Sequence, residues 1–220
     1  MARIVRDGPA GRAAALAALE RGGLIAFPTD TVYGIGVAPA TPDGIERLFA
    51  AKGRLPERAI VLLLGDATQA TEVAVLTPVG AALAAAFWPG GLTVVLPRRP
   101  GGAFQGSLTP ASGAGRLDTI GLRVPDHPAP RALARALGAL PTTSANRSGE
   151  PEARDAGEIL ASLGAALDLI LDGGPAPGDP PSTVVDATAR TVRILRHGAV
   201  AAADIARVLR DAGLPDPVGR

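Results

Sequence analysis

The ten residues from Phe27 to Gly36 constrain this chain more than any other segment. They carry three hydroxyl side chains, one carboxylate and two glycines, directly after the apolar run Leu24-Ile25-Ala26. A short apolar run of this kind indicates a buried strand. The polar residues would then follow the carboxyl end of a strand, which is where open α/β sheets usually bind ligands. The sequence therefore predicts a ligand site at this position.

The composition permits a large core but excludes several kinds of site. The chain has 220 residues, 47% of them hydrophobic and only 3% aromatic, so a core must be built from Ala, Leu, Val and Ile. The absence of cysteine excludes disulfides, thiolate catalysis and cysteine-based zinc sites. The two histidines, His127 and His197, lack metal-ligand spacing, so loop or packing roles are favoured and no metal site is expected. A net charge of +1 is not typical of nucleic-acid binding, although a local basic groove could exist within a balanced total.

The sequence predicts a cytoplasmic protein without a membrane segment. Arg3, Arg6 and Asp7 precede a short Ala/Leu segment that Glu20 and Arg21 close. This segment is too short to span a bilayer and is not typical of a signal peptide.

The apolar runs and turn residues predict an α/β (α+β) fold with a mixed, twisted open sheet flanked by helices. Strands and helices intermix without strict βαβ alternation, which favours a mixed sheet over a fully parallel one. We expect one domain over residues 1–220, with a core at about 12–199 and a frayed tail at 213–220. The expected strands are 24–27, 59–64, 92–96, 119–124, 140–143, 169–171, 183–186 and 191–195. The expected helices are 12–21, 41–52 with Thr41 as its cap, 71–76, 78–87, 129–137, 155–163 and 202–211.

A compact cationic cluster follows the second predicted helix. It consists of Lys52 and Arg54, with Arg58 close behind. Cations are favoured at a helix carboxyl terminus by the dipole, so the cluster could be a solvated helix end. It could also clamp an anion, because Arg grips phosphate or carboxylate in a bidentate fork and Lys adds a point charge.

Hydroxyl and amide side chains follow two other predicted strands. Thr142-Thr143-Ser144-Ala145-Asn146 ends one strand, and Ser144 and Asn146 point the same way in extended backbone. They could bind phosphate oxygens or a ribose, or they could be ordinary turn residues, and Ser182-Thr183 is equally ambiguous. Familiar nucleotide motifs are missing: Gly34-Ile35-Gly36 lacks the third glycine of a dinucleotide fingerprint, and no Walker-type loop occurs.

Five motifs, taken together, resemble the YrdC/Sua5 family in order, spacing and local context. They are PTDTVYGIG at 28–36, KGR at 52–54, SANRSG at 144–149, PSTVVD at 181–186 and ILRHG at 194–198. The resemblance covers about Gly22 to Ala199. It implies a YrdC/RibB-like sheet with a concave basic groove, in the short single-domain bacterial form that lacks the extra C-terminal domain of longer Sua5 proteins.

The resemblance implies an L-threonylcarbamoyladenylate synthase, a nucleotidyltransferase. Such an enzyme condenses L-threonine, bicarbonate and ATP to threonylcarbamoyl-AMP and pyrophosphate, and the product serves the t6A modification of tRNA. Mg²⁺ is expected with ATP as substrate. The implied partners are the threonylcarbamoyl transferase machinery, and direct binding of tRNA or double-stranded RNA is left open.

The resemblance also implies residue roles. Lys52 and Arg54 would be catalytic and would contact the nucleotide phosphates. The residues expected near threonine are Thr31, Arg123, which would grip its carboxylate, Thr142 and Ser182. The remaining residues expected at ATP are Arg58, Thr119, Ser144, Asn146 and Arg196. These roles agree with the chemistry, because a cationic cluster can hold carbamate and ATP together against their repulsion. The Gly-rich segment 101–115 could close over an unstable intermediate as a lid.

Two departures from the family pattern and three alternatives stay open. Arg58 stands where the family commonly has Lys or Asn, and Leu63 stands where longer members often have His. The alternatives are a YciO-like nucleotide-binding paralogue, a non-catalytic RNA-binding or ribosome-assembly factor, and the carbamoyl-transfer domain of hydrogenase-maturation proteins. Scarce aromatic residues weaken the RNA-binding alternative.

Overall fold

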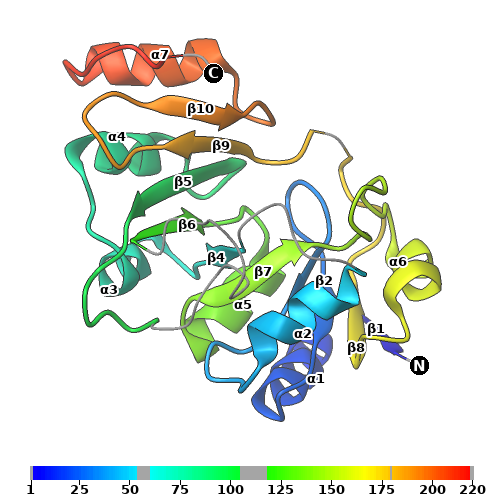
Figure 1. Cartoon of the computed structure of the whole chain (residues 1–220). Helices are drawn as coiled ribbons and strands as arrows, with labels where there is room; N and C mark the ends of the chain where they lie inside the picture. The colour runs from blue at the N-terminus through cyan, green and yellow to red at the C-terminus, as the bar shows by residue number, and fades with distance from the viewer. Residues whose placement is uncertain (1, 54–59, 105–117, 179, 219–220) are drawn as a thin grey trace.

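The computed structural model describes residues 2–53, 60–104, 118–178 and 180–218. Within them, ten strands form one twisted sheet in the order β1-β8-β2-β3-β7-β4-β6-β5-β9-β10 (Figure 1). Four neighbouring pairs are parallel and five are antiparallel, so the prediction of a mixed sheet is confirmed. The strands are β1 Arg3–Arg6, β2 Ile25–Phe27, β3 Gly34–Gly36, β4 Val61–Leu63, β5 Leu92–Pro97, β6 Thr119–Arg123, β7 Leu140–Ser144, β8 Leu169–Asp172, β9 Thr183–Asp186 and β10 Arg193–Arg196.

Helices flank the sheet. They are α1 Pro9–Glu20, α2 Gly44–Ala51, α3 Ala70–Val73, α4 Pro78–Phe87, α5 Pro128–Leu137, α6 Ala156–Leu163 and α7 Ala202–Asp211. Each predicted helix is present, and α4 matches its predicted range residue for residue. In the described part of the chain, no helix is long and apolar enough to cross a membrane.

Two hydrophobic clusters cover the sheet, because alternate side chains of each strand point to opposite faces. In β2, Ile25 and Phe27 pack in a cluster with α1 and α5. Ala26, between them, belongs to the second cluster, to which α2, α4, α6 and α7 contribute. All three side chains are completely buried. The sheet is thus covered on both faces at β2.

Two strands were not predicted from the sequence. β1 is an edge strand that pairs only with β8 among the described residues, and most of its side chains are exposed, so it lacks an apolar pattern. β3 is the Gly34-Ile35-Gly36 segment, which joins β2 to β7 in antiparallel pairing.

Two smaller predictions were wrong. Thr41 does not cap α2, because the chain makes a turn through Asp43 (φ 51°) and the helix begins at Gly44. The tail is ordered up to Val218. The Val218 N–H donates to the Val192 carbonyl (2.9 Å), and Val218 forms an isolated β-bridge with Arg193.

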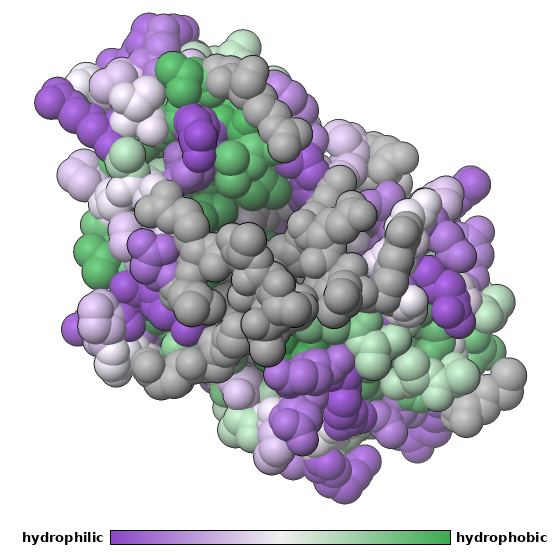
Figure 2. All heavy atoms as spheres, in the orientation of Figure 1, coloured by the Kyte–Doolittle hydropathy of each residue, from purple (hydrophilic) through white to green (hydrophobic). Residues whose placement is uncertain are grey.

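On the face shown in Figure 2, hydrophilic residues cover much of the outer rim, and apolar residues show in an area toward the top of the view. The N-terminus lies beside β1 at one end of the sheet, and the C-terminus lies beside α7 at the other (Figure 1).

Candidate functional site

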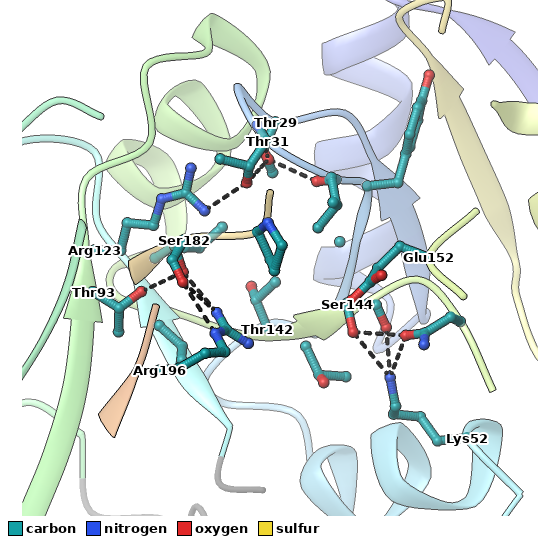
Figure 3. Close-up of a pocket in the computed structure, with 18 of the residues that line it drawn as sticks. Thr29, Thr31, Lys52, Thr93, Arg123, Thr142, Ser144, Glu152, Ser182 and Arg196 are labelled. Atoms are coloured by element: carbon teal, nitrogen blue, oxygen red, sulfur yellow. Dashed lines mark hydrogen bonds between the residues drawn. The ribbon is translucent and has the colours of Figure 1, made fainter. Parts of the chain in front are cut away.

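A cavity of about 400 Å³ is bordered by the turn after β2, the end of β6, side chains of β4, β5 and β7, and the segment that enters β9. Figure 3 shows polar side chains on two of its sides, with Arg123, Ser182 and Arg196 facing Lys52 and Ser144. The cavity brings together eight of the predicted site residues: Thr31, Lys52, Arg123, Thr142, Ser144, Asn146, Ser182 and Arg196. The polar stretch after β2 therefore lies at a ligand-sized cavity at a strand's carboxyl end, as the sequence predicts.

Arg123 is fixed at the end of β6 by three partners. Its Nε donates to the Gly90 carbonyl (2.9 Å), one terminal nitrogen donates to Thr31 Oγ1 (2.9 Å), and the other donates to Asp30 Oδ1 (2.6 Å). Burial lowers the pKa of Arg123, the Asp30 carboxylate opposes this shift, and a guanidinium stays charged in either case. Three of its five N–H groups are engaged in these contacts. Within the described parts of the chain, one N–H on each terminal nitrogen is left for an anion, which gives the two donors that a bidentate carboxylate accepts.

The turn from Thr29 to Tyr33 is held by its own hydroxyls. Thr29 Oγ1 donates to the Val32 carbonyl (2.6 Å) and accepts the Thr31 backbone N–H (3.1 Å). The Tyr33 hydroxyl donates to the Gly174 carbonyl (2.6 Å) and accepts the Gly173 N–H (3.0 Å). Burial raises the pKa of Tyr33, so its phenol remains protonated and keeps this donor. The turn is thereby tied to the loop that follows β8.

Lys52 supports the turn after β7 from below. Its ammonium donates to the Ser144 carbonyl (2.8 Å), Ser144 Oγ (3.3 Å) and Asn146 Oδ1 (2.9 Å). Ser144 Oγ also donates to Asn146 Oδ1 (2.6 Å), and Asn146 Nδ2 donates to the Glu150 carbonyl (2.6 Å). The predicted common direction of Ser144 and Asn146 is confirmed, since both side chains meet one ammonium group. Lys52 is 8% exposed, so it places a positive charge directly behind this turn.

The third part of the site joins the two C-terminal motifs. Arg196 Nε and one terminal nitrogen donate to the Ser182 carbonyl (3.0 and 2.8 Å), and the same terminal nitrogen donates to Ser182 Oγ (3.0 Å). Ser182 Oγ also lies 2.9 Å from Thr93 Oγ1 of β5. Gly198 fits beneath this segment because a Cβ there would lie 2.1 Å from the Pro181 carbonyl oxygen.

The glycines of β3 permit close packing beneath the cavity and do not form a phosphate loop. A Cβ on Gly34 would lie 2.9 Å from Thr142 Cγ2, and a Cβ on Gly36 would lie 3.0 Å from both the Phe27 ring and the Pro141 carbonyl oxygen. Any side chain here would push β3 away from β7, and with it the Thr29–Tyr33 turn away from Thr142.

Thr142 has a structural contact of its own. Its hydroxyl donates to the Leu140 carbonyl two residues back (3.0 Å), and its methyl group faces β3. The cavity wall beside it is apolar at Val61 and Leu63 of β4.

Three predicted residues are not placed at the cavity. Thr119 begins β6, four residues before Arg123, and does not line the described cavity. Its role stays a prediction. Arg54 and Arg58, like most of the predicted lid at 101–115, lie outside the described residues. The start of that segment is anchored, because the Ala103 N–H donates to the Glu72 carbonyl (2.9 Å) and Phe104 is buried under the Arg98 guanidinium.

Sequence reasoning placed Thr29 and Asp30 in the predicted ligand site without a role of their own, and it did not assign Thr93 or Glu152; all four lie at or beside the cavity. Both Thr29 and Asp30 belong to the polar stretch of the sequence. Only the fold shows that they position other site residues, since Asp30 binds Arg123 and Thr29 binds Thr31. Thr93 lies within an apolar strand and gave no signal. His127, for which a packing role was favoured, accepts the Ala129 N–H at the start of α5 (3.2 Å).

No three His, Asp or Glu side chains of the described residues gather as a metal site requires. The carboxylates at or beside the cavity are Asp30, which is paired with Arg123, and Glu150 and Glu152. The donor set of cations, hydroxyls and amides suits a polyanion that brings its own counterion.

Comparison with known proteins assigns this arrangement to a family. A model of the Sua5/YciO/YrdC family, described as "Telomere recombination", matches residues 17–198. A putative threonylcarbamoyl-AMP synthase of Mycobacterium tuberculosis (strain H37Rv) is 38% identical over 200 residues, which are 90% of this chain and 89% of that protein.

Two solved structures have the same fold. Pyrococcus abyssi Sua5 complexed with L-threonine has a TM-score of 0.83 and 29% identity, over 100% of this chain and 62% of that chain. This chain therefore spans less than two thirds of the P. abyssi protein. Escherichia coli YciO has a TM-score of 0.80 and 28% identity, over 91% and 98% of the two chains. With its five motifs gathered at one cavity, this chain belongs to the Sua5/YciO/YrdC family.

Proposed function

We propose that this protein is an L-threonylcarbamoyladenylate synthase, which converts L-threonine, bicarbonate and ATP to threonylcarbamoyl-AMP and pyrophosphate. The observation that supports this most is the division of the cavity into two parts of different chemistry. Arg123 and the Thr29–Tyr33 turn form one part, and Lys52 with the Ser144–Asn146 turn forms the other. Relatives along nearly the whole chain bear the name of this activity.

The Arg123 side of the cavity suits an α-amino acid. A substrate carboxylate can accept the two N–H groups that Arg123 keeps, with Thr31 beside them and Ser182 on the same side of the cavity. The methyl group of threonine would meet the apolar wall at Val61 and Leu63.

The Lys52 side suits the ATP phosphates. The triphosphate would be surrounded by Lys52, Ser144, Asn146 and Arg196. We propose that Arg54 and Arg58, which lie outside the described residues, add further positive charge. Mg²⁺ would enter with ATP as part of the substrate, held chiefly by phosphate oxygens.

The reaction needs no nucleophile from the protein. The threonine amine attacks the bicarbonate carbon, a C–N bond forms, and a C–O bond breaks to release water with one amine proton. A carbamate oxygen then attacks the α-phosphorus, and pyrophosphate leaves. Both steps bring anions together, so positioning and positive charge are the contributions that this site can make.

The runner-up is a YciO-like paralogue that binds nucleotide without making the product, since YciO covers this chain almost as fully as Sua5. Incubation with ATP, Mg²⁺, bicarbonate and L-threonine, followed by pyrophosphate measurement, separates the two. We expect release that needs both threonine and bicarbonate; release independent of them, or none, would favour the paralogue. Replacing threonine by serine should lower kcat/KM by roughly 10-fold or more, because one methyl contact is worth about 1–3 kcal/mol.

We further propose that the protein works in the cytoplasm and passes its product to a threonylcarbamoyl transferase acting on tRNA. The product is a mixed anhydride, which water destroys, so direct transfer to such a partner would be advantageous. Binding of tRNA by this chain itself would be tested by titration with tRNA at several salt concentrations, since phosphate contacts weaken steeply with salt.

A further inference from the structure

The hydroxyl protons in the Thr29–Val32 turn are fixed by their neighbours. The Val32 carbonyl, 2.6 Å from Thr29 Oγ1, can only accept, so the Thr29 hydroxyl donates to it. Thr29 Oγ1 lies 3.2 Å from Thr31 Oγ1. Since the Thr29 hydroxyl has only one proton, the bond between the two hydroxyls must be made by the proton of Thr31.

The Thr31 hydroxyl is consequently left with acceptor capacity alone. Its proton is directed to Thr29, and one lone pair receives the Arg123 N–H at 2.9 Å. A hydroxyl has one donor and two acceptor positions, so a ligand finds a single lone pair here. Thr31 is 4% exposed and lines the cavity, so this lone pair is what Thr31 offers to a bound molecule.

We propose that Thr29 is a positioning residue, which holds the Thr31 hydroxyl as a pure acceptor for the α-amine of the amino-acid substrate. This inference rests on the proposed function. A carboxylate can only accept and cannot bind such a hydroxyl, whereas an amine N–H can donate to it. With the substrate carboxylate on Arg123, the α-amine is the polar group closest to the carboxylate along the substrate, and it falls beside the Thr31 oxygen that the same guanidinium contacts.

The direction of this hydrogen bond matters for the reaction. A neutral amine that donates one N–H to Thr31 keeps its lone pair for the bicarbonate carbon, and its second N–H supplies the proton that leaves with water. If the Thr31 proton were free, it could bond to the amine lone pair instead and block the attack. Thr29 thus acts through Thr31, without touching the substrate.

Two threonine analogues test directly whether Thr31 accepts a hydrogen bond from the substrate. One has a hydroxyl in place of the α-amine and the other has fluorine; the groups are similar in size, but only the hydroxyl can donate. Calorimetry on the wild-type protein should show that the hydroxyl analogue binds at least about threefold more tightly, the effect of one net hydrogen bond. In Thr29→Val the freed Thr31 proton can also be directed to fluorine, so the ratio should fall toward one, and Thr29→Ser should restore it. Thr29→Val should also lower kcat more than it raises KM for threonine.

Thr77 offers a matched control. Its hydroxyl also donates to a carbonyl, that of Ala187 (2.9 Å), and accepts a backbone N–H, that of Gly80 (3.0 Å), but it caps α4 away from the cavity. Thr77→Val should lose comparable stability and keep the wild-type ratio. Equal affinities of the two analogues for the wild-type protein, or an unchanged ratio in folded Thr29→Val, would overturn the inference. The wild-type ratio decides the matter even if Thr29→Val does not fold. Failure of the proposed function would appear separately, as absent threonine-dependent pyrophosphate release.

Discussion

The Arg123 guanidinium and the Asp30 carboxylate form an ion pair with a separation of 2.6 Å at the edge of the cavity. The side chains are 7% and 17% exposed, so the charge of Arg123 depends on this partner for compensation. Asp30 comes from the turn after β2 and Arg123 from the end of β6, so the pair also connects two separate parts of the sheet.

Replacing Asp30 by alanine should therefore destabilise the fold. Removing one partner of a mostly buried pair leaves an uncompensated charge and typically costs about 3–5 kcal/mol. Urea denaturation would measure the loss. The matched control is Asp204→Ala, which breaks an exposed pair with Arg207 and should cost less than about 1 kcal/mol. A loss for Asp30→Ala no larger than that of the control would show that the charge of Arg123 is compensated elsewhere.

Lys52 and Asn146 should behave as one unit in nucleotide use. The ammonium–amide contact of 2.9 Å is charge-assisted, and such bonds contribute about 1.5–3 kcal/mol. Lys52→Met and Asn146→Ala should each lower kcat/KM for ATP, and the double variant should lose less than the sum of the two. Steady-state kinetics of the four proteins gives the coupling energy. Strict additivity would mean that the two side chains contact ATP independently.

Gly198→Ala should disturb the Ser182 segment. The added methyl group would lie 2.1 Å from the Pro181 carbonyl oxygen and 2.6 Å from the Ser182 carbonyl carbon, so the backbone must shift, at a cost of about 1–3 kcal/mol. Activity should fall together with stability, because Arg196 is hydrogen-bonded to the Ser182 carbonyl and a shift of this backbone displaces both cavity residues. Gly121→Ala is the control, since its nearest contacts would be at 3.7 Å, an ordinary packing distance. Equal thermal stability of the two variants would contradict this account.

Folding stability should depend on the protonation of His127. Burial lowers the pKa of His127 below its usual 6.5, and its Nδ1 must be unprotonated to accept the Ala129 N–H. The unfolded chain therefore binds the proton more readily. The contribution is fully present above pH 6.5 and is lost as the pH falls from there toward the folded-state pKa. In His127→Asn, which keeps a capping oxygen, the slope of unfolding free energy against pH in this window should decrease. An unchanged slope would assign the dependence to other groups.

The elements predicted correctly from the sequence are those whose buried side chains give a recognisable apolar pattern. Ala26 and Phe27 lie in an apolar run because both faces of β2 are covered, and the pattern of α4 is equally plain. β1 was missed because an edge strand with exposed Arg3 and Arg6 has no apolar pattern. Gly34 and Gly36 allow close packing in the structure, but no local signal in the sequence showed that they form a strand.

The sequence predicted which residues belong to the candidate site better than it predicted the contacts between those residues. The motifs identified Thr31, Lys52 and Arg123, since family resemblance depends on residue type and order. Pairings such as Thr93 with Ser182 depend on which strands become neighbours, and β5 meets β9 across 89 residues of sequence. Such long-range pairing is a property of the whole sheet and has no signature in either segment alone.

The contact between Gly198 and the Pro181–Ser182 backbone also bears on how the protein is made. Arg196 and Gly198 lie close to the end of the chain, while Thr31 lies close to its beginning, and both ends contribute to one cavity. Because synthesis proceeds from the N-terminus, the ribosome must release the last two strands before the cavity can be completed. The nascent protein can then neither bind both substrates nor consume ATP until β9 and β10 have been translated.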